Sequence, residues 1–278
     1  MAGKLYLHMN KDIFDLSGKV VILTGGLGLL GMNYAGVLIS KNARVVILDL
    51  AKKKEAERIL KSKFSNQELN KCFYYQADIS DQRILMRIKK EILNKFGKID
   101  VLINNAALIA NVEKGILSQS KNKIENLDLD AWNREMKVNL TGTLLCCKVF
   151  GAVMKRGASI INVSSIYGVV GPYPGIYPKG FVKPVAYSAS KGSIVALTKY
   201  LAAYWGKKGI RVNCLVPGGI SNNGRENKNF VKKYSALSPL GRLGKPDEIN
   251  GVILLLASNA SSYMTGSLVT VDGGWTAQ

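Results

Sequence analysis

Short apolar runs that alternate with longer helix-like segments are the feature that most constrains the fold of this chain. The runs are almost continuously apolar, which is typical of strands that helices cover on both faces. Strands that alternate with helices form parallel βαβ units, so we expect a doubly wound α/β sheet of about seven parallel strands. Ligands of such a sheet bind beyond the carboxyl ends of its strands.

The element boundaries follow from these patterns. The expected strands are Val20–Thr24, Arg44–Leu48, Cys72–Gln76, Ile99–Ile103, Ser159–Val163, Ile210–Leu215 and Ser267–Val271. The expected helices are Leu29–Ser40, Lys52–Lys63, Asp81–Lys95, Asp128–Val153, Val185–Trp205 and Pro246–Ala257. The expected irregular stretches are Leu108–Leu127 and Gly168–Lys183. Residues 1–13 form a polar tail, and because no linker divides the remainder we expect residues 14–278 to be a single domain.

Histidine is nearly absent, which excludes several kinds of site. The one histidine is His8, in the N-terminal tail, so the main body cannot contain a Ser-His-Asp triad or a paired-His metal site. Proton transfer near neutral pH must then use Tyr, Lys, Asp or Glu with a shifted pKa. The four cysteines show no metal-ligand spacing, so we expect reduced thiols and no metal.

The formal net charge is +20, which raises the possibility of a nucleic-acid partner. The densest basic run, Lys52–Lys54, is short and is followed by acidic residues, so we expect lysines scattered over solvated faces instead. No apolar run is long enough to span a bilayer, and the first residues lack the apolar core of a secretory signal. We therefore expect a cytoplasmic protein that binds neither nucleic acid nor membrane.

A glycine-rich turn follows the first expected strand and opens the first helix. It reads Thr24-Gly25-Gly26-Leu27-Gly28-Leu29-Leu30-Gly31. Glycines permit a tight turn and let backbone amides approach a pyrophosphate at the helix N-terminus. Asp49 ends the second strand, where an acid binds ribose hydroxyls. Its charge repels a 2′-phosphate, so we predict NAD as cofactor in preference to NADP.

A Tyr and a Lys lie four residues apart at the start of the helix that follows the fifth strand. Tyr187 and Lys191 share one face of that helix, and a nearby ammonium favours the phenolate. Tyr187 is therefore a candidate base that needs no histidine. Ser165, just beyond the fifth strand, is a candidate to bond a substrate oxygen.

Together these segments resemble the short-chain dehydrogenase/reductase family, in its compact single-domain branch with a Rossmann-type fold. The similarity runs from about Phe14 to Gly274. The matching segments are the glycine turn, Asp49, Ala77-Asp78-Ile79, Asn104-Asn105-Ala106-Ala107, Asn139, Ser165, Tyr187 with Lys191, Pro217-Gly218-Gly219 and Val271-Asp272-Gly273-Gly274.

The resemblance implies a role for each matching position. Tyr187 would be the acid-base, Lys191 would lower its pKa and bind the nicotinamide ribose, and Ser165 would hold the substrate oxygen. Asn139 would anchor a water that links Lys191 to solvent. The residues implied to bind the cofactor are Gly25, Gly26, Leu27, Gly28, Leu29, Leu30, Gly31, Asp49, Asp78, Ile79, Asn105, Ala106, Ala107, Tyr187, Lys191, Pro217, Gly218, Gly219 and Ile220.

Three positions depart from the family pattern. Leu29 stands where the compact branch has a glycine, and Ala107 replaces the last glycine of Asn-Asn-Ala-Gly. The interval between Ser165 and Tyr187 is longer than usual and includes GPYPGIYPKGFVKP. We expect this loop, residues 168–183, to form one wall of the substrate pocket.

The leading hypothesis is reversible hydride transfer between a secondary alcohol and its ketone. Two alternatives remain, a non-catalytic NAD-binding sensor and a sugar-nucleotide epimerase or dehydratase. The segments SGKVVILTGG, KPVAYSASK and VDGGWTA resemble a subgroup that acts on sugars and sugar acids, which implies a sugar, sugar acid or sugar nucleotide as substrate. The resemblance also implies a homo-oligomer, a tetramer or dimer, with the helices Asp128–Val153 and Val185–Trp205 at the interface.

Overall fold

The computed structural model describes residues 12–108, 122–222 and 224–278. Its centre is a seven-stranded parallel sheet in the order β3-β2-β1-β4-β5-β6-β7. The strands are β1 Val20–Thr24, β2 Arg44–Asp49, β3 Cys72–Gln76, β4 Val101–Asn104, β5 Ser159–Val163, β6 Arg211–Pro217 and β7 Leu268–Val271. The predicted doubly wound, Rossmann-type α/β fold is therefore confirmed.

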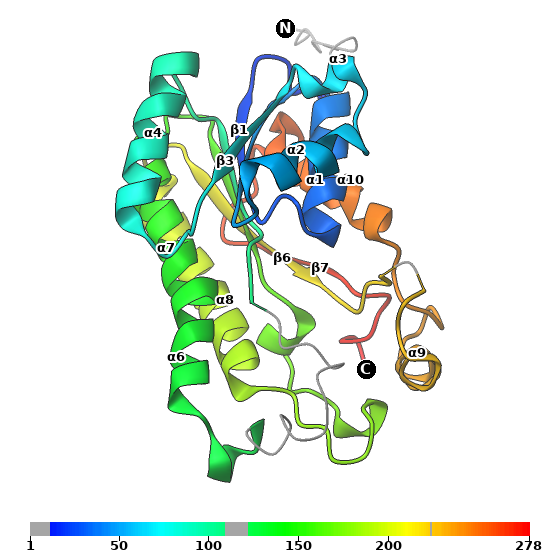
Figure 1. Cartoon of the computed structure of the whole chain (residues 1–278). Helices are drawn as coiled ribbons and strands as arrows, with labels where there is room; N and C mark the ends of the chain where they lie inside the picture. Colours follow the sequence, from blue (N-terminus) through cyan, green and yellow to red (C-terminus); the bar gives the residue numbers. More distant parts are fainter. Residues whose placement is uncertain (1–11, 109–121, 223) are drawn as a thin grey trace, which may run out of the picture.

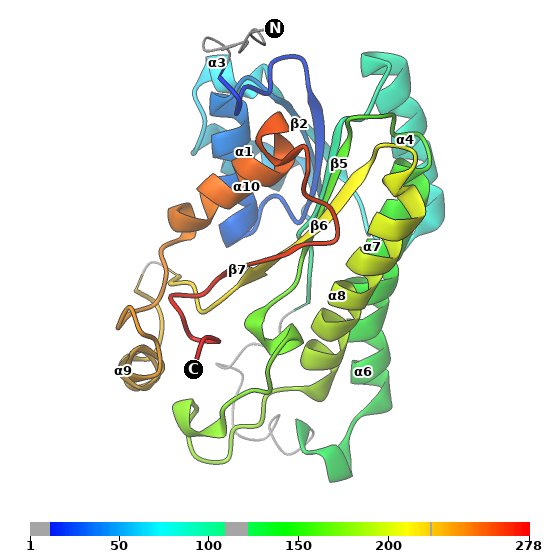
Figure 2. The ribbon, with the colours of Figure 1, turned by 180° about the vertical axis from the view of Figure 1, so that it is seen from behind.

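Helices cover both faces of the sheet (Figures 1 and 2). One face is covered by α4 Gln82–Phe96, α6 Leu129–Met136, α7 Thr143–Cys146 and α8 Val185–Gly206. The other face is covered by α1 Leu29–Ser40, α2 Lys53–Lys61 and α10 Asn250–Ala257. Each face has its own apolar core, one centred on Phe150 and Trp205, the other on Tyr34 and Leu38. The sheet is thus buried on both sides, as its continuous apolar strands require.

The strand order reverses between β1 and β4, which are neighbours in the sheet. From β1 the chain proceeds outward through β2 and β3, and then returns to the other side of β1. The loops that leave β1 and β4 therefore diverge and open a crevice at the carboxyl edge. This edge is the expected place for a ligand.

The long helix predicted for Asp128–Val153 is interrupted. Its α-helical turns alternate with wider π-helical turns at Lys137–Gly142 and Cys147–Gly151. Pro246–Ala257 begins with a 3₁₀ turn, Pro246–Ile249, before α10. Other predicted boundaries differ by one or two residues, which is usual for helix and strand ends.

Among the described residues, the helices α3 Asn66–Leu69 and α9 Lys228–Ala236 were not predicted. Short 3₁₀ turns also occur at Ile124–Asn126, Ile166–Gly168, Pro174–Ile176 and Asn259–Ser261. Nearly all of the predicted tail lies in residues 1–11, outside the described residues, as do residues 109–121 of the irregular stretch. Among the described helices, none is both long and apolar enough to cross a membrane.

Candidate active site

Thr24 joins the two strands that flank the reversal of strand order. Its hydroxyl accepts the backbone N–H groups of Asn105 and Ala106, at 3.0 and 3.1 Å, just beyond the end of β4. The Asn105 side chain donates back to the carbonyls of Thr24 and Gly25, at 3.2 and 3.0 Å. These bonds fix the glycine turn against the segment that follows β4.

The glycines of the turn have different structural roles. Gly25 adopts a positive φ of 62°, and a Cβ there would lie 2.7 Å from the Cα of Ala106. A Cβ at Gly31 would lie 2.2 Å from the carbonyl oxygen of Gly25, so Gly31 permits α1 to pack on the turn. A Cβ at Gly28 would meet nothing closer than 3.5 Å. Because Gly28 lines the pocket and has no side chain, its own backbone is accessible to a ligand.

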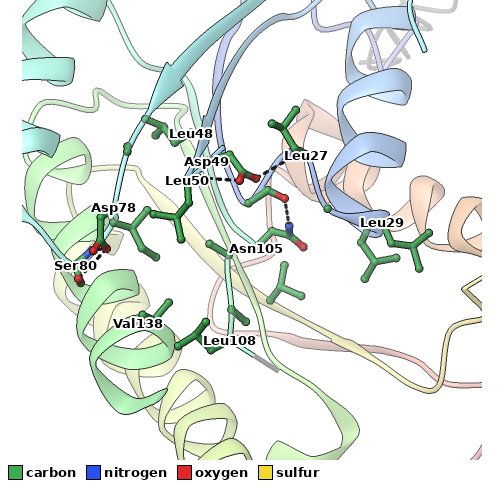
Figure 3. Close-up of a pocket in the computed structure, with 18 of the residues that line it drawn as sticks. Leu27, Leu29, Leu48, Asp49, Leu50, Asp78, Ser80, Asn105, Leu108 and Val138 are labelled. Carbon is green, nitrogen blue, oxygen red and sulfur yellow. Dashed lines mark hydrogen bonds between the residues drawn. The ribbon is translucent and has the colours of Figure 1, made fainter. Parts of the chain in front are cut away.

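Asp49 faces the glycine turn from the end of β2 (Figure 3). Its carboxylate accepts the N–H of Leu27 at 3.1 Å and that of Leu50 at 2.8 Å. The carboxylate is thus fixed beside the turn, where an acid can accept hydrogen bonds from ribose hydroxyls. Leu50 is 62% exposed and lies on the pocket wall, so it offers an apolar surface next to that acid.

One pocket of about 890 Å³ runs along this edge. The predicted residues that line it are Gly25, Leu27, Gly28, Leu29, Leu30, Asp49, Asp78, Ile79, Asn105, Ala106, Ala107, Ser165, Tyr187, Lys191, Pro217, Gly218 and Ile220. The predicted residues that do not line it are Gly26, Gly31, Asn139 and Gly219. Gly26 and Gly219 instead allow close packing, since a Cβ would meet Ile47 or Tyr234.

Several residues that line the pocket belonged to none of the sequence motifs. Leu50, Ser80, Leu108 and Val138 are among those visible in Figure 3. Others are Leu48, Ala51, Glu55, Ile59, Arg134 and Lys137. Most lie just after a strand or on an adjoining helix turn, and the rule that ligands bind at carboxyl ends of strands would have indicated their neighbourhood.

The side chains of Ser165 and Tyr187 form a hydrogen bond. Both are buried, and both line the pocket. Burial raises the pKa of the Tyr187 phenol, while its hydrogen bond with Ser165 lowers it and the charge of Glu135 raises it. Ser164 fixes this arrangement because its hydroxyl donates to the backbone carbonyl of Lys191 at 2.7 Å.

Lys191 is almost fully buried beneath the same pocket. Its Nζ donates to the carbonyl of Val163 at 2.8 Å and lies 5.9 Å from the centroid of the Tyr187 ring. Burial lowers the pKa of Lys191 to about 8. Burial is the largest influence on the Tyr187 pKa and raises it, and the predicted lowering of that pKa by Lys191 stays a prediction.

Asn139 lies within the first π-helical segment and clamps three elements together. Its amide accepts the N–H of Leu108 at 2.7 Å, donates to the carbonyl of Leu108 at 3.1 Å, and donates to Ser190 Oγ at 3.3 Å. Asn139 therefore positions the chain after β4 against α8. Its predicted part in anchoring a water stays a prediction.

The loop at residues 168–183 packs beside this site and against α9. Tyr177 contacts the Phe181 ring at 4.7 Å and the Phe230 ring of α9 at 5.8 Å, between centroids. The Tyr177 hydroxyl lies 2.7 Å from that of Tyr167. The loop thus forms an aromatic cluster that also includes Tyr187. Its predicted role as a wall of the substrate pocket stays a prediction.

The chemistry of these residues suits a dinucleotide. Gly28 and Leu29 at the start of α1 present backbone to the pocket, and the first amides of a helix have no partner within it. Asp49 suits a ribose, and the Ser165, Tyr187 and Lys191 cluster lies further along the same pocket. Fold and site together define a Rossmann-type, dinucleotide-dependent oxidoreductase.

Comparison with known proteins agrees with this class. A family profile described as enoyl-(acyl carrier protein) reductase matches residues 29–276. The chain belongs to the short-chain dehydrogenase/reductase family.

Three relatives illustrate the similarity. The chain is 32% identical to 2,5-dichloro-2,5-cyclohexadiene-1,4-diol dehydrogenase of Sphingobium indicum, over 95% of this chain and 99% of that protein. It is 34% identical to trans-4-hydroxycyclohexanecarboxylate dehydrogenase of Sinomonas cyclohexanicum, over 93% of each. A solved short-chain dehydrogenase from Leptospira borgpetersenii with bound NAD+ is 30% identical, covers 96% of each chain and superposes with a TM-score of 0.79.

Proposed function

We propose that this protein is an NAD-dependent dehydrogenase that interconverts a secondary alcohol on a ring and the corresponding ketone. The observation that most supports it is the placement of Ser165, Tyr187 and Lys191 in the same pocket as the glycine turn and Asp49. Two of the relatives, at 32% and 34% identity, are named as dehydrogenases of ring alcohols, which favours this substrate class. The sugar substrates implied by sequence resemblance remain a prediction.

In the proposed reaction, Ser165 and Tyr187 hold the alcohol oxygen and Tyr187 accepts its proton. The nicotinamide, when bound, accepts the hydride. Lys191 supplies a buried positive charge close to Tyr187, which favours the phenolate that accepts the alcohol proton. Asn139 holds the backbone of Leu108 in place, so the segment after β4 keeps its position beside the reacting groups. Catalysis then depends mainly on positioning and on stabilising the oxygen's charge.

An absorbance assay for reduced nicotinamide tests this proposal against its alternatives. Ring alcohols, polyols, sugar acids and nucleotide sugars are mixed with protein and either cofactor. A dehydrogenase accumulates NADH, whereas an epimerase regenerates NAD and a sensor binds NAD without turnover. Absence of NADH from every alcohol would contradict the proposal.

Asp49 is proposed to select NAD over NADP. Its carboxylate is fixed by the backbone amides of Leu27, Leu50 and Ala51 beside the pocket, so a 2′-phosphate would meet a negative charge. We expect a higher kcat/KM with NAD in the wild type. Asp49→Ala and the nearly isosteric Asp49→Asn should narrow this preference by about tenfold or more. Steady-state kinetics with both cofactors measure it, and a wild-type preference for NADP would contradict it.

A homo-oligomer is proposed, with α8 at an interface. Tyr200 and Tyr204 of α8 stack on each other at 6.1 Å and remain 67% and 61% exposed. Such exposed aromatic surface suits a symmetric interface. Light scattering should give a multiple of the 30.3 kDa monomer mass. The double change Tyr200→Glu and Tyr204→Glu should reduce that mass, whereas Tyr263→Glu, at another exposed Tyr, should not. A monomeric wild type would end this proposal.

A further inference from the structure

Lys183, at the end of the loop, is a positive charge that the proposed mechanism does not use. Its ammonium lies 4.5 Å from the centroid of the Tyr187 ring and 5.9 Å from that of Tyr167. It makes no hydrogen bond or ion pair with any residue that the structure describes. Burial lowers the pKa of Lys183, so placing this charge here has a cost that no hydrogen bond or ion pair with a described residue offsets.

The buried acid Glu135 forms no ion pair with this charge among the described residues. Glu135 of α6 is buried, and its charge favours the protonated form of Lys183. Yet the two groups form no ion pair within 4 Å among the described residues, and Glu135 Oε1 has no hydrogen-bond partner. Burial also raises the pKa of Glu135. The positive charge of Lys183 therefore remains available to a bound anion.

Lys183 also lines a second cavity, of about 710 Å³, between the 3₁₀ turn at Ile124–Asn126 and the start of α8. Four side chains there can donate hydrogen bonds, since Asn122, Lys123 and Asn126 join Lys183 in the lining. The lining also includes Val182, Val185 and Ile124, which are apolar, and Glu125, which is acidic. Lys183 thus lines a donor-rich cavity and also lies over the ring of the proposed catalytic tyrosine.

We propose that this cavity is a subsite for the carboxylate of a cyclic hydroxy acid, and that Lys183 is the residue that binds it. The proposal rests on the proposed function, because it assigns the substrate's hydroxyl to Tyr187. A singly charged group fits better than a phosphate, since Glu125 and Glu135 would repel a dianion. The apolar lining suits the hydrocarbon ring.

Calorimetry on the NAD-saturated protein tests the subsite without any need for turnover. The probes are cyclohexanecarboxylate, the uncharged cyclohexanecarboxamide and cyclohexyl phosphate. In the wild type, the carboxylate should bind about tenfold or more tightly than the amide, as expected for a charge-assisted hydrogen bond. Lys183→Met should remove this preference and Lys183→Arg should retain it. Lys179→Met, at an exposed lysine of the same loop, should behave like the wild type.

The outcomes separate this inference from the proposed function. Equal binding of carboxylate and amide by the wild type overturns the subsite, even where ring alcohols yield NADH. Tighter binding of the phosphate overturns the assignment to a carboxylate. Carboxylate binding that depends on Lys183 supports the subsite, even where no alcohol yields NADH and the proposed function fails. Thermal unfolding and NAD affinity of Lys183→Met, both close to wild type, show that its loss of preference is local.

Discussion

Tyr187→Phe should lower kcat by about 10² to 10⁴-fold and leave NAD affinity nearly unchanged. The substitution removes the one hydroxyl proposed to accept the substrate proton and keeps the ring that packs beside Lys183 and Lys191. The main chain and the remainder of the pocket should be unaffected, because a buried phenol becomes a buried phenyl of nearly the same volume. Rates of NADH formation, with NAD affinity from calorimetry, separate the two effects.

Ser188→Ala is a matched control for this experiment. Ser188 adjoins Tyr187 on the first turn of α8, and its buried hydroxyl has no hydrogen-bond partner among the described residues. Loss of that hydroxyl should leave kcat within about twofold of wild type, since no hydrogen bond is removed. If Tyr187→Phe keeps more than a tenth of wild-type kcat, another group transfers the proton and the mechanism is wrong.

The parts of the fold that sequence predicted are those set by local periodicity. β1 is apolar except for its last residue, so its burial followed from the sequence alone. The glycine turn and the Tyr187–Lys191 spacing are likewise local patterns, and the structure places both at the pocket. α9 was not predicted because it is short and mostly polar, with Tyr234 as its one buried residue. Its position depends on aromatic contacts with Tyr177, which is distant in sequence.

The parts of the site that sequence missed depend on contacts between distant segments. Asn139 lies in a π-helical segment, and its side chain forms hydrogen bonds with the backbone of Leu108, which lies far earlier in the sequence. The pairing of Lys191 with the Val163 carbonyl depends on how α8 lies over β5. Glu135 and Lys183 approach each other only because α6 and the start of α8 pack together. The periodicity of one segment does not predict which distant residues that segment will contact.

The two helix-side glycines of the turn should respond differently to substitution. A methyl at Gly31 would lie 2.2 Å from the Gly25 carbonyl oxygen and 2.7 Å from Gly26 Cα, both backbone atoms that cannot rotate away. We expect Gly31→Ala to destabilise the fold by about 1–3 kcal/mol or more, as overpacking does, and to lose NAD binding with it. Thermal unfolding without cofactor measures the first effect.

Gly28→Ala should instead keep the fold and lose the ligand. Gly28 has a φ of −72°, which any residue adopts, and the new methyl would meet nothing closer than 3.5 Å. Its Tm should therefore stay close to that of wild type. Because Gly28 lines the pocket where backbone is expected to approach the pyrophosphate, the methyl should weaken NAD binding by about tenfold or more. Calorimetric titration with NAD measures this. Wild-type affinity in a stably folded Gly28→Ala would mean that the dinucleotide does not approach this turn, and the proposed cofactor site would be wrong.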